Sequence, residues 1–363
     1  MIEIAHGNLL ESDADALVNT VNCVGYMGKG IALQFKQAFP DNFRTYEAAC
    51  RHGDVVPGRV LVHDYGVLQR PRYIINFPTK NHWRAKSRIE DIDSGLVALV
   101  QVVRDYGIRS IAVPPLGCGL GGLDWSAVRP RIESAFAGLP DVHVYLYGPE
   151  KTPPARAMPV RTDRPGMTAA RALFIKLMDA YAVLAYRRTL LEIQKLAYFL
   201  QAAGEPLKLN YEAGKYGPYA HNLNKVLERL EGHYVRGYGD SQNKDAEIEL
   251  LPGAVEAAEA FLDQDSQSRV RLGRVSELIE GFETPYGMEL LATVHWVATR
   301  GEAGGEPPAR DVEEAIRAVH RWNPRKQWIF TPEHIRIAWD HLSHLGWLDG
   351  SRDAPDNGPL LEG

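Results

Sequence analysis

The sequence is poor in cysteine and has no long apolar run, and both absences limit what the protein can be. The three cysteines, Cys23, Cys50 and Cys118, are odd in number and widely spaced in 363 residues, which argues against a disulfide framework and a four-thiolate zinc site. Its twelve histidines are spread thinly, so no metal site is predicted. No run reaches the roughly 18 apolar residues of a membrane span, and MIEIAHGNLL lacks the features of a secretory signal. We therefore expect a cytoplasmic protein.

Excess positive charge is absent too, since the formal net charge is −5, and a broad affinity for nucleic acid is not predicted from charge alone. From Asp245 to Ser268 the chain carries seven acidic residues and no Lys or Arg. This stretch fits either a solvated helix face or a surface that imitates a nucleic-acid backbone toward a basic partner. Both interpretations stay open from the sequence.

The length predicts two domains of different character. Strand-like runs alternate with amphipathic stretches, notably 89–106 and 125–138, through the first 149 residues. That pattern is typical of an α/β sheet with helices on both faces, which binds ligands at the carboxyl edge of its strands. The predicted strands are IEIAH, ADALVNTVN, RVLVHDYG, RYIINFPT, SIAVPPL and VHVYLYG.

A proline-rich segment separates the two halves. Residues 150–167 include four prolines with mixed charge and few apolar residues, and they predict an extended linker. After this segment the apolar residues recur with helical spacing, so we expect a mainly α-helical domain over residues 168–350, with a small hairpin around 207–216. Residues 351–363 lack periodicity and predict a flexible tail.

Two glycine-rich loops are the strongest functional signal. VNTVNCVGYMGKGIA (residues 18–32) and PPLGCGLGG (residues 114–122) each follow a strand-like run, and neither has the phosphate-loop or dinucleotide-fold spacing. Glycine lets backbone amides approach an anion, and the first loop leads into a helix whose N-terminus favours negative charge. The pair predicts a diphosphate cradle of another class, although each loop singly could be an ordinary glycine-rich turn.

Polar side chains near these loops supply candidates for chemistry. Asn22 suits either a ribose hydroxyl or a turn with local backbone bonds. Lys80 ends a strand between the two loops, and His82 and Trp83 follow it as proton-shuttle and base-stacking candidates, or as plain surface and packing residues. Asp124 fits a helix cap better than an acid. Loop packing suits Cys23 and Cys118 better than nucleophilic roles, because no base motif surrounds them.

The first half of the chain resembles the macrodomain family, whose members bind ADP-ribose between two such loops. The resemblance covers Met1 to about Gly148 and rests on GNLLESDADALVNTVN, NCVGYMGKGIALQFK, YIINFPTKNHW and IAVPPLGCGLGGLDW. It implies a three-layer α/β/α fold with a mixed sheet, and it implies no cofactor besides the ligand ADP-ribose. The lysine after the third motif resembles the terminal ADP-ribose protein glycohydrolase branch, and within it the bacterial antitoxins that remove ADP-ribose from thymine bases in DNA.

This resemblance implies roles for individual residues. Lys80 would be catalytic, His82 and Trp83 would meet the substrate base, and no metal is implied. The implied ADP-ribose contacts are Asn8 and Leu9 beside the adenine, Thr20, Asn22, Gly25, Met27, Gly28, Lys29, Gly30 and Ile31 in the first loop, and Pro115, Leu116, Gly117, Cys118, Gly119 and Leu120 in the second. The chain departs from the branch at Gly121, where the glycohydrolases carry an aspartate.

The missing carboxylate leaves the mechanism open. Lys80 could attack the anomeric carbon as a neutral amine and form an imine, if its pKa is lowered. As a protonated amine it could instead stabilise the departing base. Two other functions also fit the first half, namely an ADP-ribose reader without catalysis and a hydrolase of ADP-ribosylated protein or O-acetyl-ADP-ribose.

The helical half resembles the Panacea-type antitoxin domain in LLEIQKLAYFLQ and KYGPYAHNLNKVLERL. Tyr186, Tyr198 and Phe199 in this half are typical of core aromatics. The resemblance implies that this domain binds and inhibits a cognate DNA ADP-ribosyltransferase toxin, whose basic groove the acidic stretch would suit. The substrate implied for the whole chain is ADP-ribosylated DNA, with no membrane partner.

Overall fold

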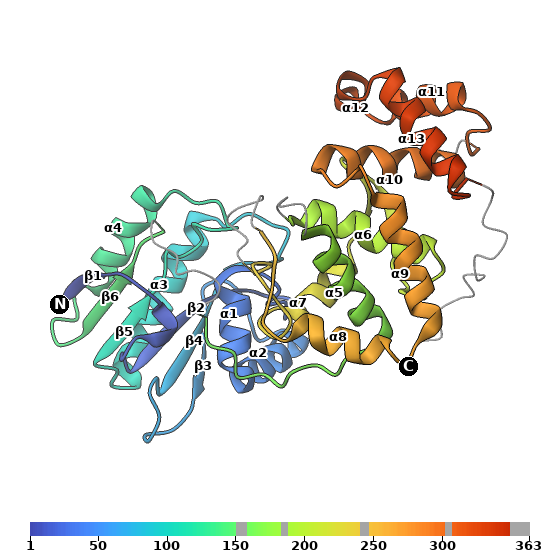
Figure 1. The fold of residues 1–363 in the computed structure, drawn as a ribbon. Helices are drawn as coiled ribbons and strands as arrows, with labels where there is room; N and C mark the ends of the chain where they lie inside the picture. The colour runs from blue at the N-terminus through green and yellow to red at the C-terminus, as the bar shows by residue number, and fades with distance from the viewer. Residues whose placement is uncertain (150–157, 183–187, 240–246, 302–306, 349–363) are drawn as a thin grey trace. The chain divides into compact units, whose positions relative to one another are not determined.

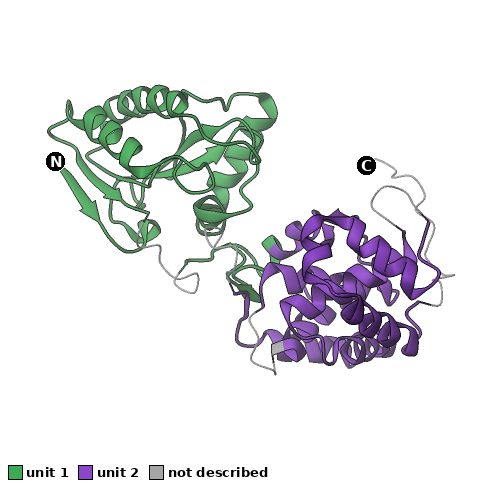
Figure 2. Ribbon diagram, turned by 90° about the horizontal axis from the view of Figure 1, so that it is seen from above, with its two compact units in different colours: residues 1–165, 228–246 green, residues 166–227, 247–363 purple. Residues whose placement is uncertain are grey.

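A computed structural model describes residues 1–149, 158–182, 188–239, 247–301 and 307–348. The chain divides into two compact units, which are described separately. The first comprises Met1–Pro165 and Glu228–Ala246, and the second comprises Gly166–Leu227 and Glu247–Gly363 (Figure 2). None of the described helices is long and apolar enough to cross a membrane.

The first unit is built on a six-stranded mixed sheet. Its strand order is β1-β6-β5-β2-β4-β3, in which β3 is antiparallel to β4 and the other neighbours are parallel. All six predicted strands are confirmed, at β1 (Ile2–Ala5), β2 (Ala16–Asn22), β3 (Leu61–Asp64), β4 (Tyr73–Lys80), β5 (Ser110–Val113) and β6 (His143–Tyr147). The α/β class predicted from their alternation with helices is therefore confirmed.

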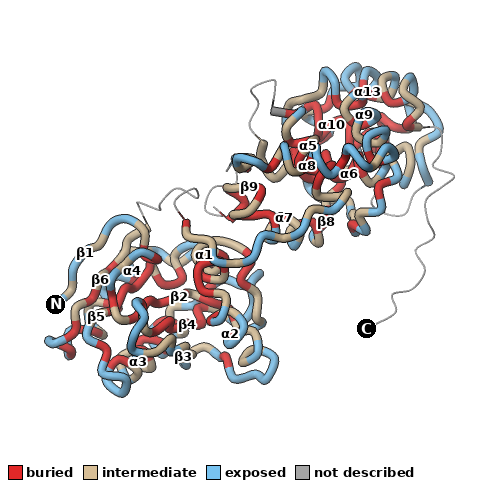
Figure 3. The backbone as a smooth tube through the Cα atoms, turned by 60° about the horizontal axis from the view of Figure 1, so that its bottom comes forward, coloured by how far each residue is buried: buried red, intermediate tan, exposed pale blue. Residues whose placement is uncertain are grey.

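Helices cover both faces of this sheet (Figure 1). Alternate residues of β2 point to opposite faces, as a strand requires. Val18 packs in the core cluster that includes residues of α3 (Ile89–Asp105) and α4 (Trp125–Phe136). Its neighbour Leu17 packs in the cluster that includes α1 (Gly30–Ala38). Because both faces are covered, β2 and β4 are almost wholly buried (Figure 3), which explains their continuous apolar runs.

One helix of this unit has no counterpart in the sequence predictions. Helix α2 (Pro40–His52) starts with proline in its first turn and ends at Gly53, whose φ of 79° closes the C-terminus. A short 3₁₀ helix, Leu9–Glu11, precedes β2. Asn42 and Tyr46 are the buried residues of α2, so its inner face is too polar to stand out as an apolar stripe.

The second half of the chain is mainly helical, as predicted. The predicted hairpin is present but lies a few residues later, as β7 and β8. Tyr198 and Phe199 are buried in the core, whereas Tyr186 and residues 349–363 lie outside the described residues. The elements are α5 (Ala169–Ala182), α6 (Leu190–Ala202), β7 (Tyr211–Gly214), β8 (Gly217–Ala220), α7 (Leu223–Leu230), β9 (Val235–Arg236), β10 (Glu249–Leu250), α8 (Ala254–Leu262), α9 (Ser266–Ile279), α10 (Pro285–Thr299), α11 (Val312–Trp322), α12 (Pro324–Ile329) and α13 (Pro332–His344).

The division into units differs from the boundaries expected from the sequence. The described part of the expected linker packs on the first unit, where Met158 joins the core beside α1 and the Arg161 amide donates to the Gln37 carbonyl oxygen at 2.8 Å. Residues 228–246 also return to the first unit. Sequence composition reports average apolar content, and these segments dock through a single buried methionine and hydrogen bonds to the backbone, which composition does not reveal.

The acidic stretch contains residues that are used inside the second unit. Glu259 pairs with Lys176 at 2.7 Å, and Asp265 caps α9 by accepting from the Ser268 amide at 3.0 Å. Asp263 lies 3.4 Å from Arg269. These contacts fit the solvated-face interpretation, and Asp245 lies outside the described residues.

Candidate active site

The strand order brings both glycine loops and Lys80 to one edge of the sheet. Strand β2 lies between β5 and β4, and all three run parallel, so their carboxyl ends share an edge. The first loop leaves β2, the second follows β5, and Lys80 ends β4. Asn22 is the register partner of Lys80, next to an irregularity after Val21. The sequence elements that predicted one site are therefore neighbours at this edge.

Lys80 is held at the strand end in a partly buried position. Its Nζ donates to the Trp83 carbonyl oxygen at 3.2 Å, and its own carbonyl oxygen lies 3.5 Å from the Cys23 Sγ of the first loop. Burial lowers the pKa of Lys80, and the positive charge of Lys86 lowers it further. The lysine therefore loses its proton more readily than a solvated lysine.

An exposed aromatic cluster adjoins Lys80. The Trp83 ring lies 5.5 Å from Tyr26 of the first loop and 5.3 Å from His82, measured between ring centroids. The Arg84 guanidinium lies 4.5 Å above the Trp83 ring. Because 40% of Trp83 is exposed, the cluster offers an aromatic surface on which a base can stack.

Asn22 is engaged inside the first loop. Its Oδ1 accepts from the amides of Val24 at 3.0 Å and Tyr26 at 3.4 Å, and its Nδ2 donates to the Tyr26 carbonyl oxygen. The Tyr46 hydroxyl donates to the Asn22 carbonyl oxygen at 2.8 Å. These local bonds fit the interpretation of Asn22 as a turn residue, and its contact with a ribose hydroxyl stays a prediction.

The second loop is closely packed and has no room for a side chain at Gly121. A Cβ there would collide with the Ser87 Oγ and the Gly117 carbonyl oxygen, while the Ser87 amide donates to the Gly121 carbonyl oxygen at 3.0 Å. Gly117 and Gly122 have φ values of 71° and 79°, which favour glycine. Packing therefore requires glycine at position 121, where the family carries an aspartate.

Lys86 and Ser87 lie beside the second loop and are candidate site residues that the sequence did not predict. The Lys86 Nζ would lie 3.0 Å from a Cβ at Gly122, so its side chain runs along the second loop. The Ser87 Oγ is buried without a hydrogen-bond partner beside the same loop. Their only sequence signal is position, since both lie a few residues after Lys80, His82 and Trp83.

The predicted adenine contacts have structural roles. The Asn8 Oδ1 caps the 3₁₀ helix by accepting from the Leu10 amide at 3.1 Å. Leu9 is buried in the core cluster shared with Leu17 and Phe35. Met27 and Leu116, at the two loops, are also buried, and their contacts with ADP-ribose stay predictions.

Alternative catalytic groups find no support in the geometry. Burial raises the pKa of the Cys23 and Cys118 thiols to about 11, so both stay protonated near neutral pH. Asp124 caps α4 by accepting from the Ser126 amide at 2.9 Å. Among the residues that the structure describes, no three His, Cys, Asp or Glu side chains are grouped to hold a metal ion.

Comparison with known proteins matches the sequence to one family. Residues 18–132 match the Macro domain family. A DNA ADP-ribosyl glycohydrolase of Thermus aquaticus is 46% identical over 98% of this chain and 99% of its own length. A DNA ADP-ribosyl transferase-DNA ADP-ribosyl glycohydrolase fusion protein of Thermosipho africanus is 34% identical over 41% of this chain and 42% of its own. The solved macrodomain of Mycobacterium tuberculosis DarG is 56% identical over 41% of this chain and 99% of its own, with a TM-score of 0.41.

Proposed function

The chain belongs to the DarG family of DNA ADP-ribosyl glycohydrolases, and from that premise we propose that it hydrolyses the N-glycosidic bond between ADP-ribose and thymine in single-stranded DNA. The observation that carries the proposal is the register pairing of Lys80 with Asn22, which sets a lysine of lowered pKa beside the first glycine loop. The first and second loops would hold the diphosphate of ADP-ribose with backbone amides. The base would then leave toward the aromatic cluster.

Lys80 is the proposed catalytic residue, and its partial burial supports the nucleophilic route. A neutral Nζ would attack the anomeric carbon, the bond to thymine would break, and the base would leave with the electron pair and take up a proton. The ring-opened sugar would stay on Lys80 as an imine, which water would hydrolyse to release ADP-ribose. The alternative, in which protonated Lys80 stabilises the leaving base, needs no covalent bond.

Trp83 and His82 support DNA as the substrate. An exposed indole beside the reacting lysine can stack on a base of a flexible single strand, and stacking on an aromatic side chain is worth about 1–3 kcal/mol per base. Arg84, stacked on the indole, adds a positive charge for the DNA backbone. This surface therefore favours a nucleic-acid substrate over ADP-ribosylated protein or O-acetyl-ADP-ribose.

We also propose that the helical unit binds and inhibits the cognate DarT-type DNA ADP-ribosyltransferase toxin. Its motifs resemble a Panacea-type antitoxin domain, and the Thermosipho relative is named as a fusion of the two activities. The test uses a full-length Lys80→Ala protein that lacks hydrolysis. Stoichiometric inhibition of the toxin by this variant supports a binding role, whereas unchanged toxin activity contradicts it.

Hydrolysis is tested on a labelled ADP-ribosylated oligonucleotide beside an ADP-ribosylated protein. We expect ADP-ribose release from the oligonucleotide, its loss in Lys80→Ala, and normal turnover in Lys225→Ala, which changes an exposed lysine of α7. Near-normal turnover by Lys80→Ala would refute the lysine mechanism. Tight ADP-ribose binding without release would favour the reader, and faster release from protein would favour the protein hydrolase.

A further inference from the structure

A segment from the second half of the sequence folds onto the first glycine loop. This strap, Glu228–Gly239, runs from the last turn of α7 through β9 and belongs to the first unit (Figure 2). It touches the first loop at Gly28, Lys29 and Gly30, three consecutive residues that are expected to face the diphosphate.

The backbone contact takes a donor of the helix N-terminus. The Gly30 amide, at the first residue of α1, donates to the Gly239 carbonyl oxygen at 2.9 Å. The first amides of a helix have no partner inside the helix and form its anion-binding site. One of the donors expected to hold phosphate is therefore occupied by an oxygen of the strap.

The side-chain contacts bring a carboxylate and an aromatic ring to the same place. The Glu228 Oε1 would lie 2.5 Å from a Cβ at Gly28, and the same carboxylate accepts a hydrogen bond from the Tyr26 hydroxyl. The Lys29 Nζ lies 5.2 Å from the centroid of the Tyr238 ring. Burial lowers the pKa of Lys29, and the nearby Glu228 carboxylate acts in the opposite direction. The lysine is thus partly shielded from incoming ligands.

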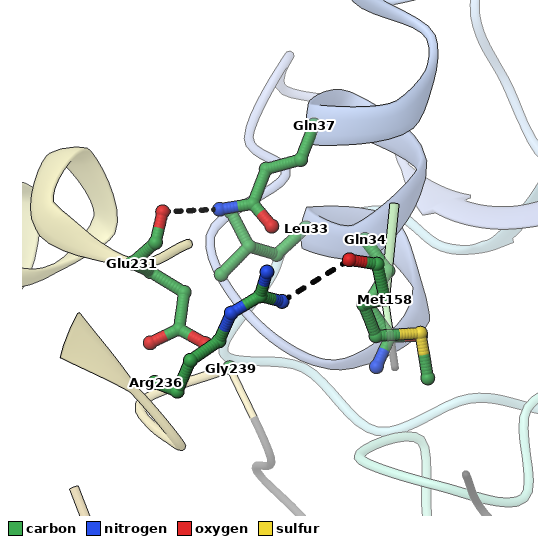
Figure 4. Close-up of a pocket in the computed structure, with 7 residues that line it drawn as sticks. All are labelled: Leu33, Gln34, Gln37, Met158, Glu231, Arg236 and Gly239. Atoms are coloured by element: carbon green, nitrogen blue, oxygen red, sulfur yellow. Dashed lines mark hydrogen bonds between the residues drawn. The ribbon is translucent and has the colours of Figure 1, made fainter. Parts of the chain in front are cut away.

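The strap has a defined conformation of its own. The buried Glu231 carboxylate accepts from the amides of Gly237 at 3.1 Å and Tyr238 at 3.0 Å. The backbone carbonyl oxygen of Glu231 accepts from the Gln37 Nε2 at 2.7 Å. Arg236 donates to the Met158 carbonyl oxygen at 3.2 Å. Figure 4 shows Gln37, Met158, Glu231 and Arg236 among the residues that line a pocket beside α1. The contacts with the first loop therefore belong to a segment that is held in place by several hydrogen bonds.

We propose that the Gly239 carbonyl, which accepts from the Gly30 amide, and the Glu228 carboxylate, which lies against Gly28, take the place where the first loop would receive the diphosphate of ADP-ribose, and that ligand binding releases the strap. A carboxylate and a carbonyl oxygen here stand in for phosphate oxygens. Glu228 is then an affinity-determining residue for the reaction, although it lies far from the macrodomain motifs in sequence. The inference rests on the proposed function, since it assumes a diphosphate ligand.

The expected effect follows from competition between the two states. When only a fraction of the molecules has an open site, the apparent dissociation constant is raised by the reciprocal of that fraction. Removing one carboxylate charge near a partly buried anion site is expected to tighten ADP-ribose binding at least about threefold. Adenosine has no diphosphate, so its binding should not change.

The decisive experiment compares full-length Glu228→Gln with Glu256→Gln, which removes the same charge at an exposed position of α8. Isothermal titration gives the Kd for ADP-ribose and for adenosine, and turnover of the ADP-ribosylated oligonucleotide gives KM and kcat. We expect a lower Kd for ADP-ribose and a lower KM in Glu228→Gln alone, with kcat and adenosine binding unchanged. Equal ADP-ribose affinity in both variants and the wild type would overturn the inference.

Hydrogen exchange of the wild-type chain is a second readout that needs no variant to fold. Saturating ADP-ribose should speed exchange at the strap amides of Gly237 and Tyr238 and slow it in the first loop. Unchanged or slower exchange in the strap, with ADP-ribose bound, would show that the strap is a fixed wall. If ADP-ribose binds to no form of the chain, the proposed function fails and this inference fails with it.

Discussion

Restoring the family aspartate at Gly121 is expected to damage the enzyme, and this prediction tests the packing of the second loop. A Cβ at residue 121 would overlap the Ser87 Oγ and the Gly117 carbonyl oxygen, and would lie 2.9 Å from the Gly117 carbonyl carbon. The serine can rotate, but the Gly117 backbone is held by the hydrogen bond between its carbonyl oxygen and the Leu123 amide at 3.1 Å. Gly121→Asp must therefore move the loop.

The size of the effect can be estimated from two contributions. Overpacking a close-packed site costs about 1–3 kcal/mol. Loss of the hydrogen bond from the Ser87 amide to the Gly121 carbonyl oxygen adds about 1 kcal/mol. At roughly 2–4 °C per kcal/mol for a domain of this size, the melting temperature of Gly121→Asp should fall by roughly 4–16 °C.

Differential scanning calorimetry and oligonucleotide turnover measure the two consequences. We expect lower kcat/KM in Gly121→Asp, and a partial recovery of stability in the Gly121→Asp, Ser87→Gly double variant, because only one of the two collisions is removed. Gly138→Asp is the matched control, since a Cβ there meets only Arg104 Nη2 at 3.9 Å. Higher kcat in Gly121→Asp at an unchanged melting temperature would show that the loop accepts a carboxylate and would refute the reasoning.

Three further predictions concern other residues. Lys86→Met should raise the pKa of Lys80 by removing a neighbouring positive charge, so the pH profile of kcat/KM should move to higher pH, while Lys86→Arg should leave it in place. Cys118→Ala should retain turnover within about twofold and the native thiol should react slowly with a disulfide reagent at pH 7.5, because burial raises its pKa to about 11. Glu289→Gln should lower the free energy of unfolding of the helical unit, measured in urea, by about 3–5 kcal/mol. The reason is that it leaves the fully buried Lys326 ammonium without the carboxylate that lies 2.7 Å away. A cost below about 1 kcal/mol would contradict this prediction.

Strands β2 and β4 were predictable because the two covered faces of the sheet demand continuous apolar runs, whereas β1 shows the alternation of apolar and polar residues that is typical of a partly exposed strand. Apolar periodicity located α3 and α4, whose inner faces carry a regular apolar stripe. It missed α9, whose sequence SQSRVRLGRVSELI has two arginines and a glycine between its apolar residues. Its buried apolar residues, Val275, Leu278 and Ile279, all lie in its C-terminal half, so no apolar stripe runs along the whole helix.

The candidate site was predictable as far as local motifs reach. The two loops and Lys80 stand out in the sequence, and strand order then makes them neighbours. The strap could not be predicted, because it joins Tyr26 to Glu228 across some 200 residues and no apolar pattern marks a backbone contact such as that of Gly30 with Gly239. The crowding at Gly121 was equally hidden, since it depends on Ser87 from another segment.

The discontinuous first unit has a consequence for protein synthesis. Its sixth strand ends at Tyr147, whereas the strap ends at Gly239, about 90 residues later in the chain. At roughly 5–20 residues per second, the ribosome needs about 5–20 s to make that interval. During each round of translation the nascent sheet is therefore complete well before the strap emerges, and the first glycine loop of a newly made chain has nothing yet to cover it.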